Sequence, residues 1–587
     1  MVVAAQVLGI HRLRLMKFRW NIAGPQPLLA NKLIEELRLS PLLAQCLLNR
    51  GLSEPAFAVA FLEPRLKSLA DPFLLPNMAA GVERLWLGRN RGEPIVIFGD
   101  YDVDGVTSTA LLLESLRALG WKAEAYLPSR MDEGYGLTQE GAENCLQKFP
   151  RTTLLLAVDC GSTAVESIAW LRGRGVDVLV LDHHQPSNPT PAAVALVNPQ
   201  LSPDGAFVEL CSVGLAFKLV HAIVKRGRDE KIPAFTDFDL RPLLDLVALG
   251  TVADLVPLTG ENRILVPAGL KCLSETRRPG LVALKKVAEV NGEVNAYAVG
   301  FQLGPRLNAA GRMENAEAAL RLVLAKDATE ATPLAAELDA RNRERQEVER
   351  GIAEQAIGAV RARFDPGRDF IIVEGQLLWH IGVVGIVASR VLREFYRPTL
   401  ILGGDNAAFR GSGRSVEGFD LAAALRECDD LLIRHGGHAM AAGVTVHPDK
   451  VDALRERLNG IARRTLRPEQ LQPPLRLDAQ VSLVDITLNA VEELARLEPF
   501  GQGNSAVQIV VRNLQCSRPP LRMGKEKQHA KLFVTDGLAN SEAVFWGVGN
   551  AALPEGRFDL AAVPQINEFN GRRSVQLKVL DWRPATT

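Results

Sequence analysis

The sequence predicts an α/β protein with a parallel-sheet domain, a second α/β domain joined to it by a long helix, and a small C-terminal β-barrel. Three observations predict this arrangement. Short apolar strands alternate with helical stretches between about 93 and 182, a long charged helix follows, and short strands separated by turns fill roughly the last hundred residues. A chain of 587 residues is also too long for one hydrophobic core.

The domain boundaries follow from these changes of pattern. We place an N-terminal helical segment at 1–75, the parallel-sheet domain at 76–325, the connector helix at 326–366, the second α/β domain at 367–470 and the barrel at 471–587. Lys and Arg together number 68, as do Asp and Glu, so no overall basic excess indicates a nucleic-acid partner. The local charge pattern therefore has to decide between partners.

The cysteine pattern and the hydropathy limit the cellular compartments in which we expect this protein. The seven cysteines are scattered without a CxxC pair, which argues against a disulfide framework and against a thiolate zinc site. We find no signal peptide, and no stretch of about 20 apolar residues that a membrane span requires. A soluble protein of the reducing cytoplasm, without membrane contact, is expected.

The first domain repeats a strand, a turn and a helix. Apolar runs at 94–98, 153–158 and 176–181 read as strands, and 106–119 reads as the first helix. Continuous apolar strands of this kind lie in parallel sheets that are covered on both faces. Ligands of such sheets bind at the carboxyl ends of the strands.

The connector and the barrel have their own patterns. The segment 333–364 is helical in pattern, but 341–350 carries seven charged residues and a single aliphatic one, Val348, which predicts a helix that bridges two bodies. Short strands at 507–511, 531–534, 543–546 and 574–580, with an Asn570-Gly571 turn, fit a barrel of the oligonucleotide-binding (OB) type. A barrel that only packs remains an alternative.

Acidic residues and histidines follow every predicted strand of the first domain. They are Asp100, Asp102 and Asp104 after 94–98, Asp159 after 153–158, and Asp182, His183 and His184 after 176–181, with Asp254 after a later apolar segment. A single Asp after a strand is usually a helix cap, but several at one sheet edge repel one another unless cations hold them. Oxygen and imidazole donors without thiolate suit Mn²⁺ or Mg²⁺. Two such ions suit phosphoryl transfer.

A calcium loop is a competing interpretation of the first acidic cluster. The stretch 100–105 has the opening of an EF-hand loop. Position twelve of that loop would be Leu111, where a bidentate Glu is needed. The preceding apolar strand also opposes an EF-hand.

Four stretches resemble the motifs of the DHH phosphoesterase superfamily: GDYDVDGVTS at 99–108, VDCG at 158–161, LDHH at 181–184 and GTVADLVPL at 250–258. Three more, GPRLNAAGR at 304–312, WHIGVVGIVASR at 379–390 and GGHAMAAG at 436–443, resemble the RecJ-type exonucleases within it. The resemblance implies a DHH domain, a DHH-associated domain and an OB-like domain. It covers the chain from about Ile95 to Val579.

The resemblance also implies roles for the acidic cluster. Metal ligation falls to Asp102, Asp104, Asp159, His183 and Asp254, with Asp159 as the bridge between two ions. Asp100 and Asp182 would orient the ligands. His184 would contact the scissile phosphate or assist the leaving group. Small relatives place a histidine where this chain has Phe98, so we expect one metal to be held more weakly.

Substrate contacts are expected mostly in the second α/β domain. The residues assigned to substrate are Arg306, Asn308, Arg312, His380, Arg390, Ser412, Gly413, Arg414, Gly437 and His438. Ser412 to Arg414 would grip a phosphate. A turn histidine and ordinary surface arginines are the competing interpretations of these residues. In the barrel, Arg518, Arg522, Lys525, Lys527, His529 and Lys531 cluster near Phe533 and Trp546, as in proteins that track single strands.

The implied activity is a single-stranded-DNA-specific 5′ to 3′ exonuclease of DNA repair and recombination. It would release 5′-mononucleotides with two Mn²⁺ or Mg²⁺ ions. We expect a monomer, with a single-stranded-DNA-binding protein and a helicase as partners. The alternatives are a phosphodiesterase for cyclic dinucleotides or very short oligoribonucleotides, and a DNA-binding scaffold with a degenerate site.

Overall fold

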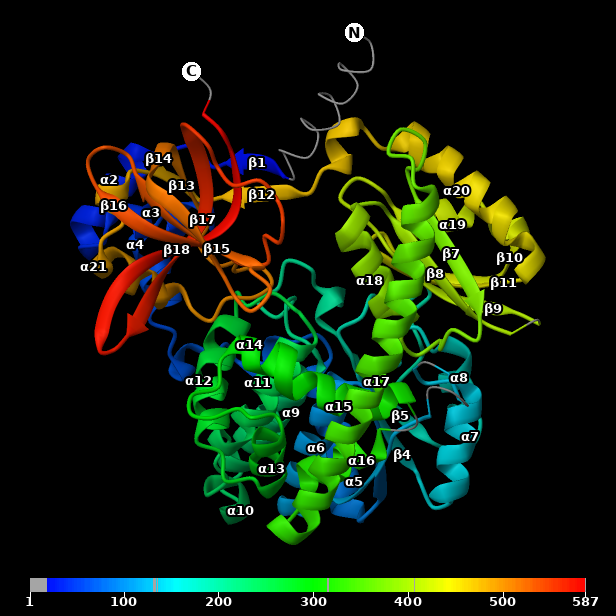
Figure 1. The fold of residues 1–587 in the computed structure, drawn as a ribbon. Coiled ribbons are helices and arrows are strands. Elements are labelled where there is room, and N and C mark those ends of the chain that lie inside the picture. The colour runs from blue at the N-terminus through cyan, green and yellow to red at the C-terminus, as the bar shows by residue number, and fades with distance from the viewer. Residues whose placement is uncertain (1–17, 130–132, 135, 314–315, 406, 586–587) are drawn as a thin grey trace. The chain divides into compact units, whose positions relative to one another are not determined.

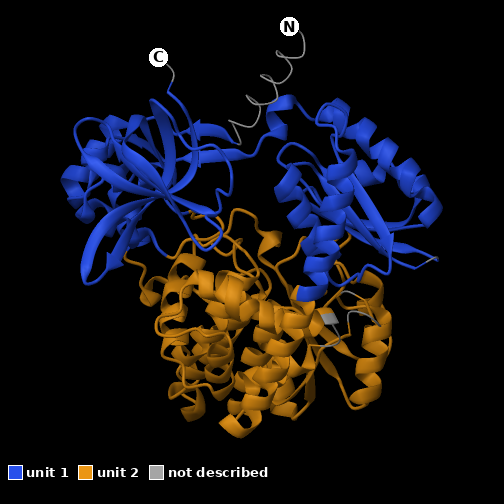
Figure 2. Cartoon of the chain, viewed as in Figure 1, with its two compact units in different colours: residues 1–62, 347–498, 506–587 blue, residues 63–346, 499–505 orange. Residues whose placement is uncertain are grey.

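The computed structural model describes residues 18–129, 133–134, 136–313, 316–405 and 407–585. The chain forms two compact units (Figure 2). Unit 2 holds 63–346 and 499–505, and unit 1 holds 1–62, 347–498 and 506–587. Among the described helices, none combines the length and the apolar character that crossing a membrane requires.

Unit 2 is built on a parallel sheet, as the sequence predicts (Figure 1). This sheet has five strands, two more than the sequence indicated. In spatial order the strands are β3 (Lys122–Tyr126), β2 (Pro94–Phe98), β4 (Leu154–Val158), β5 (Asp177–Leu181) and β6 (Ala195–Val197). The chain leaves β2 toward β3 on one side, and β4 lies on the other. This reversal makes the carboxyl ends of β2 and β4 a topological switch point.

Alternate residues of the strands belong to two separate cores, because successive side chains point to opposite faces. Ile95 and Ile97 pack in a large core with α5 (Met78–Arg91), α6 (Val103–Ala118), α9 (Ser212–Asp229) and α11 (Leu244–Ala253). Val96 and Phe98 pack in a smaller core with α7 (Gln139–Lys148) and α8 (Val165–Arg172). Both faces of the sheet are therefore covered.

Further helices complete unit 2. They are α10 (Pro233–Thr236), α12 (Asn262–Ser274), α13 (Pro279–Val287), α14 (Ala296–Ala298), the π-helical turn η5 (Val299–Leu303), α15 (Gly304–Met313) and α16 (Glu317–Leu324). Short 3₁₀ turns lie at η1 (Leu66–Ser68), η2 (Pro72–Leu74), η3 (Pro199–Leu201) and η4 (Arg241–Leu243). None of these short elements was predicted individually.

The predicted connector is helix α17 (Ala328–Arg363), which starts five residues before the expected Pro333. The chain passes from unit 2 to unit 1 within this helix. Its charged middle is not all solvated, because Asn342, Arg345 and Glu349 are 2%, 7% and 3% exposed. Arg345 donates to Asn342 Oδ1 at 3.0 Å. A charged sequence thus supplies a polar buried face, which hydropathy alone does not reveal.

The second α/β domain, in unit 1, has a mixed sheet of β7 (Ile372–Leu377), β8 (Thr399–Gly404), β9 (Phe409–Arg414), β10 (Leu432–His438) and β11 (Ala441–Val446). The spatial order is β10-β11-β9-β8-β7, and only β7 and β8 run parallel. One face packs on α18 (Val384–Phe395) and the last turns of α17, the other on α19 (Leu421–Arg426) and α20 (Val451–Thr465).

The C-terminal part of unit 1 is an OB-like sheet. Its strands are β13 (Ala479–Val481), β14 (Ile509–Met523), β15 (His529–Thr535), β16 (Asn540–Phe545), β17 (Phe558–Phe569) and β18 (Arg572–Pro584). The order is β13-β14-β15-β16-β18-β17, and the long β14 also pairs with β17. The sequence missed β17 and underestimated the length of β14.

The N-terminal segment joins this OB-like region. Strand β1 (Arg19–Ile22) pairs in parallel with β12 (Pro474–Leu477), and α2 (Pro27–Leu37), α3 (Pro41–Asn49) and α4 (Pro55–Leu62) follow. Helix α21 (Leu488–Leu494) contacts α3. A pairing across so many residues has no local signal in the sequence.

Candidate metal centre

The acidic residues and histidines that follow the predicted strands come together at the carboxyl edge of the unit 2 sheet. Asp100, Asp102 and Asp104 follow β2, Asp159 follows β4, and Asp182, His183 and His184 follow β5, while Asp254 ends α11. Ligand atoms from these residues lie within 4.8 Å of one another in three groups. The groups are Asp159-His183-His184, Asp104-His183-Asp254 and Asp100-Asp102-Asp159.

Two glycines let the first acidic loop fold back tightly. A Cβ on Gly99 would lie 2.1 Å from Thr109 Oγ1, and one on Gly105 would lie 2.5 Å from the carbonyl oxygen of Asp100. Asp102 caps α6 by accepting a hydrogen bond from the Gly105 amide at 3.1 Å. The loop therefore presents three carboxylates over one short turn.

Asp104 is held by the amino end of another helix. Its Oδ2 accepts from the Ser212 amide at 2.7 Å and its Oδ1 from the Val213 amide at 2.8 Å, both in the first turn of α9. The side chain is buried, and burial together with the neighbouring Asp102 raises the pKa of Asp104 to about 7. The helix amides fix the carboxylate in place without supplying a full positive charge.

Asp159 occupies an uncommon backbone conformation. Its φ is +63°, in the left-handed region that L residues with a Cβ rarely adopt. Its Oδ1 accepts from the hydroxyl of Ser212 at 2.9 Å. Burial, with Asp104 next, raises the pKa of Asp159 well above its ordinary value. Ser212 thus touches two predicted ligands, although no motif in the sequence marks it.

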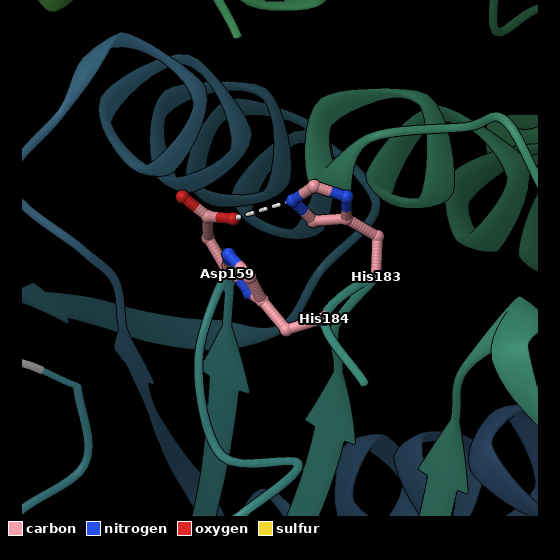
Figure 3. Close-up of side chains that lie close together, drawn as sticks. All are labelled: Asp159, His183 and His184. Carbon is pink, nitrogen blue, oxygen red and sulfur yellow. Dashed lines mark ion pairs between the residues drawn. The ribbon is translucent and has the colours of Figure 1, made fainter. Parts of the chain in front are cut away.

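His183 faces two carboxylates without bonding to either. Its Nε2 lies 3.6 Å from Asp159 Oδ1 and 3.5 Å from Asp254 Oδ2 (Figure 3 shows His183 pointing at Asp159). Burial lowers the pKa of His183 to about 4, so the ring is neutral at pH 7 and carries a lone pair. Burial and Asp104 raise the pKa of Asp254 to about 9.

These two atoms test whether a metal fits. Among the described residues, His183 Nε2 and Asp254 Oδ2 are buried atoms with no hydrogen-bond partner. No Lys or Arg of the described chain forms an ion pair with Asp104, Asp159 or Asp254. Converging carboxylates and a neutral imidazole without thiolate fit a hard divalent cation. The donor set therefore agrees with Mn²⁺ or Mg²⁺.

Asp182 organises the turn that carries both histidines. Its Oδ1 accepts from the amide of His183 at 2.8 Å and contacts His184 Nδ1 at 2.7 Å, and its Oδ2 accepts from the Ser162 amide at 3.0 Å. Despite its burial, these contacts hold the pKa of Asp182 below its usual value. Burial lowers the pKa of His184, but Asp182 outweighs burial and raises it to about 9, so this ring is cationic at neutral pH.

Two of the three substrate residues predicted in unit 2 form hydrogen bonds with other residues of unit 2. Arg306 donates to Asp339 Oδ1 at 2.9 Å and to the Gln302 carbonyl at 2.7 Å. Asn308 accepts from the Val103 amide at 3.2 Å, which ties α15 to the first acidic loop. Arg312 lies at the end of α15, half-buried. The sequence did not indicate the contacts of Arg306 and Asn308.

Those predicted in unit 1 gather around one sheet. Ser412, Gly413 and Arg414 lie on β9, Gly437 and His438 on β10, and β11 pairs with both strands. Arg414 donates to Ser412 Oγ at 2.9 Å. A Cβ on Gly385, in the first turn of α18, would lie 3.2 Å from Arg414 Nη2, so this helix end adjoins the arginine.

The other two substrate residues predicted in unit 1, His380 and Arg390, have hydrogen-bond or ion-pair partners outside this sheet. His380 Nδ1 accepts from the Gly382 amide at 3.1 Å. Arg390 pairs with the buried Glu349 at 2.6 Å. The Arg390 side chain is 43% exposed.

A groove of about 1240 Å³ runs over the OB-like sheet. Its lining includes Arg518, Lys531, Phe533 and Trp546 from the predicted basic and aromatic cluster, together with Phe569 and Arg572, which were not predicted. The Arg518 guanidinium lies 3.3 Å from the centroid of Phe533. Arg522 turns to the Gly549 and Ala551 carbonyls instead. The groove combines basic and aromatic side chains.

Family models match three parts of the chain. The DHH family N-terminal domain matches 94–251, the DHHA1 domain matches 368–464 and the RecJ OB domain matches 477–581. The single-stranded-DNA-specific exonuclease RecJ of Bacillus subtilis (strain 168) is 38% identical over 575 residues, covering 96% of this chain and 71% of that protein. RecJ of Escherichia coli (strain K12) is 35% identical, covering 92% and 95%.

A solved structure is similar over nearly the whole chain. The crystal structure of RecJ in complex with Mn²⁺ from Thermus thermophilus matches with a TM-score of 0.84 and 30% identity, covering 97% of this chain and 80% of that one. These likenesses extend from the metal-centre domain through the OB-like domain, and they confirm the predicted fold class.

Proposed function

Because this chain belongs to the RecJ family of single-stranded-DNA-specific exonucleases, we propose that it degrades single-stranded DNA from the 5′ end and releases 5′-mononucleotides. The observation that carries the proposal is the buried group of carboxylates facing the unpartnered Nε2 of His183. The 5′ to 3′ direction and a role in DNA repair and recombination rest on the family alone.

Five residues would hold two Mn²⁺ or Mg²⁺ ions: Asp102, Asp104, Asp159, His183 and Asp254. Bound ions of this kind activate water and neutralise charge that develops on a phosphate. Asp159 belongs to two of the three ligand groups, which supports its role as the bridge. Asp100 belongs to one group as well, so it is a candidate ligand in addition to the orienting role expected for it.

The two histidines would play different parts. Neutral His183 offers Nε2 as a ligand. Cationic His184 has its Nδ1 bound to Asp182 and a side chain that is 35% exposed, so its ring would bring positive charge to a phosphate oxygen. Asp182 would fix the orientation of this ring, as carboxylates do beside functional histidines.

The strand would be gripped through phosphate and base contacts in unit 1. Ser412 and Arg414 on β9 adjoin the first turn of α18, where backbone amides favour anions. Further contacts are proposed for Gly413, Gly437, His438, His380 and Arg390 and, in unit 2, for Arg306, Asn308 and Arg312. The OB-like groove would hold more distant nucleotides by stacking on its aromatic rings.

We further propose that the protein works as a monomer in the cytoplasm, with a helicase and a single-stranded-DNA-binding protein as partners. A nuclease that accepts only single strands needs an enzyme that separates duplex DNA. The support for these partners is the proposed substrate itself.

Degradation of single-stranded DNA labelled at each terminus in turn tests the activity and its direction. With Mn²⁺ present, the 5′ label should appear first as a mononucleotide, whereas the 3′ label should stay in long products. Release of the 3′ label first would refute the direction. Preferred hydrolysis of a dinucleotide over a long oligonucleotide would favour the small-substrate alternative, against which the OB-like groove argues.

A further inference from the structure

Two aromatic side chains stack on each other at the surface of unit 2, outside the metal centre. Tyr297 in α14 and Phe301 in η5 have ring centroids 4.8 Å apart and planes inclined by 25°. They are 65% and 69% exposed. Large aromatic side chains are normally buried, and an exposed pair of this kind marks an interaction site.

The backbone beneath the pair is anchored. Val299 and Leu303 of the same π-helical turn are buried at 0% and 1% exposure. The Gln302 carbonyl accepts a hydrogen bond from Arg306, which is itself held by Asp339. A Cβ on Gly300, next to Phe301, would meet nothing within 4 Å. The rings therefore stand on a fixed turn beside open space. Binding of a ligand there would order little additional backbone, so the entropic cost of binding is small.

The turn that carries the pair is continuous with the wall of the metal centre. Phe301 lies three residues, about 5 Å of helix, before Gly304. A Cβ on Gly304 would lie 3.4 Å from the Cβ of Ala253, the residue that precedes Asp254. One turn later, Asn308 binds the first acidic loop. The turn that carries the pair thus packs beside the end of α11, where Asp254 lies.

We propose that Tyr297 and Phe301 form a stacking platform for a nucleobase of the strand whose phosphate lies at the metal centre. This inference rests on the proposed function. The carboxylates and histidines described at the metal centre suit cations and phosphate, while an aromatic face accepts every base and holds a strand without selecting its sequence. Continuity with the metal centre favours this occupant over another protein.

Abasic scanning of the substrate tests the platform. Oligonucleotides of equal length, each lacking one base at successive positions from the cleaved end, are compared as substrates of the wild type and of the Tyr297→Ala/Phe301→Ala variant. The wild type should lose about 5- to 10-fold in kcat/KM at one position, the low end for loss of a stacked base. The variant should lose as much on intact DNA and nothing further at that position.

Two further variants separate stacking from general effects. Phe57→Ala removes an equally exposed phenylalanine, 65% exposed on α4 of unit 1, and should keep the wild-type pattern. Phe301→Trp keeps an aromatic face and should retain the positional loss with abasic DNA.

Two results overturn the platform. In one, the double alanine variant still loses kcat/KM when the base at that position is missing; in the other, the wild type loses kcat/KM at no position. A double variant that changes the sedimentation of the protein but not the abasic pattern makes the pair a protein contact, which also overturns it. A wild type that cuts no single-stranded DNA at all refutes the proposed function, and this result is seen on intact DNA before any variant is compared.

Discussion

Helix α9 supports two buried groups of ionisable side chains that differ in how their charge is compensated. Its first turn binds Asp104 through the amides of Ser212 and Val213. Its middle carries Lys218, fully buried, which pairs with Glu261 and donates to the Ala70 carbonyl at 3.0 Å. Glu261 in turn accepts from the Ala70 amide at 2.6 Å. The group around Asp104 brings like charges together, whereas Lys218 and Glu261 bring opposite charges together.

The pKa values express the difference. In the metal centre, burial and neighbouring carboxylates raise the pKa of Asp104 to about 7 and that of Asp254 to about 9. Without a cation these acids are partly protonated at neutral pH, so binding of a divalent ion would release protons. Lys218 has an internal counter-ion instead. A buried cluster of side chains with the same charge thus indicates a ligand site, whereas a buried pair of opposite charges indicates a structural role.

Asp159→Asn should have the largest effect. We expect nuclease activity to fall by about 10³-fold or more, because a metal supplies several kcal/mol of transition-state stabilisation. The metal-free protein should be no less stable than the wild type, since the cost of burying this acid among other carboxylates is removed. Cleavage of end-labelled DNA and thermal melts with and without Mn²⁺ measure both. A variant that keeps a tenth of the activity would contradict the metal assignment.

Lys218→Met should show the opposite pattern. Removing the cation leaves Glu261 buried and unpaired, so the free energy of unfolding should fall by about 3 kcal/mol. The activity of the remaining folded protein should not change. Lys225→Met is the matched control on the same helix, because its pair with Asp71 has side chains that are 41% and 43% exposed and should contribute under about 1 kcal/mol. Equal destabilisation by both variants in urea titrations would refute the distinction.

The sequence predicted which side chains come together at the candidate metal centre, because strand ends are local signals. Apolar runs that end in Asp104, Asp159 or His183 are visible in the chain, and parallel strands bring their carboxyl ends to one edge. Asp254 also follows an apolar segment, but that segment is the helix α11 and not a strand, so the rule for strand ends does not place it. The domains were recognisable for the same local reasons.

What escaped prediction depends on contacts between distant segments. Ser212 touches Asp104 and Asp159, but nothing near Ser212 in the sequence indicates this. Strand β1 pairs with β12 across most of the chain. The Arg306 guanidinium binds Asp339 and the Gln302 carbonyl, two contacts that the sequence did not indicate.

Asp182→Asn sharpens the comparison within the metal centre. Asp182 has hydrogen-bond donors around it, so we expect it to position His183 and His184. We expect a 10- to 100-fold loss of activity, smaller than for Asp159→Asn, as found for groups that orient metal ligands. Rates measured over a Mn²⁺ titration separate weaker metal binding from a slower reaction. A loss as large as that of Asp159→Asn would place Asp182 among the ligands.

The smallest effect concerns His221, one turn after Lys218 in α9. Burial, with the nearby Lys218 next, lowers the pKa of His221 to about 4, and its Nδ1 is a buried atom with no hydrogen-bond partner among the described residues. Between pH 6.5 and 4 the unfolded chain therefore binds a proton that the folded chain does not, so stability falls as the pH falls through this window.

Relative to pH 7, the wild type at pH 5 should lose about 1 kcal/mol more than His221→Phe, allowing for partial solvent screening. Urea titrations of both proteins at the two pH values measure the difference. In the Lys218→Met background the difference should shrink, because a neighbouring positive charge that disfavours protonation of His221 is gone. An undiminished difference there would show that burial alone sets the pKa of His221, and that the two residues do not form one electrostatic group.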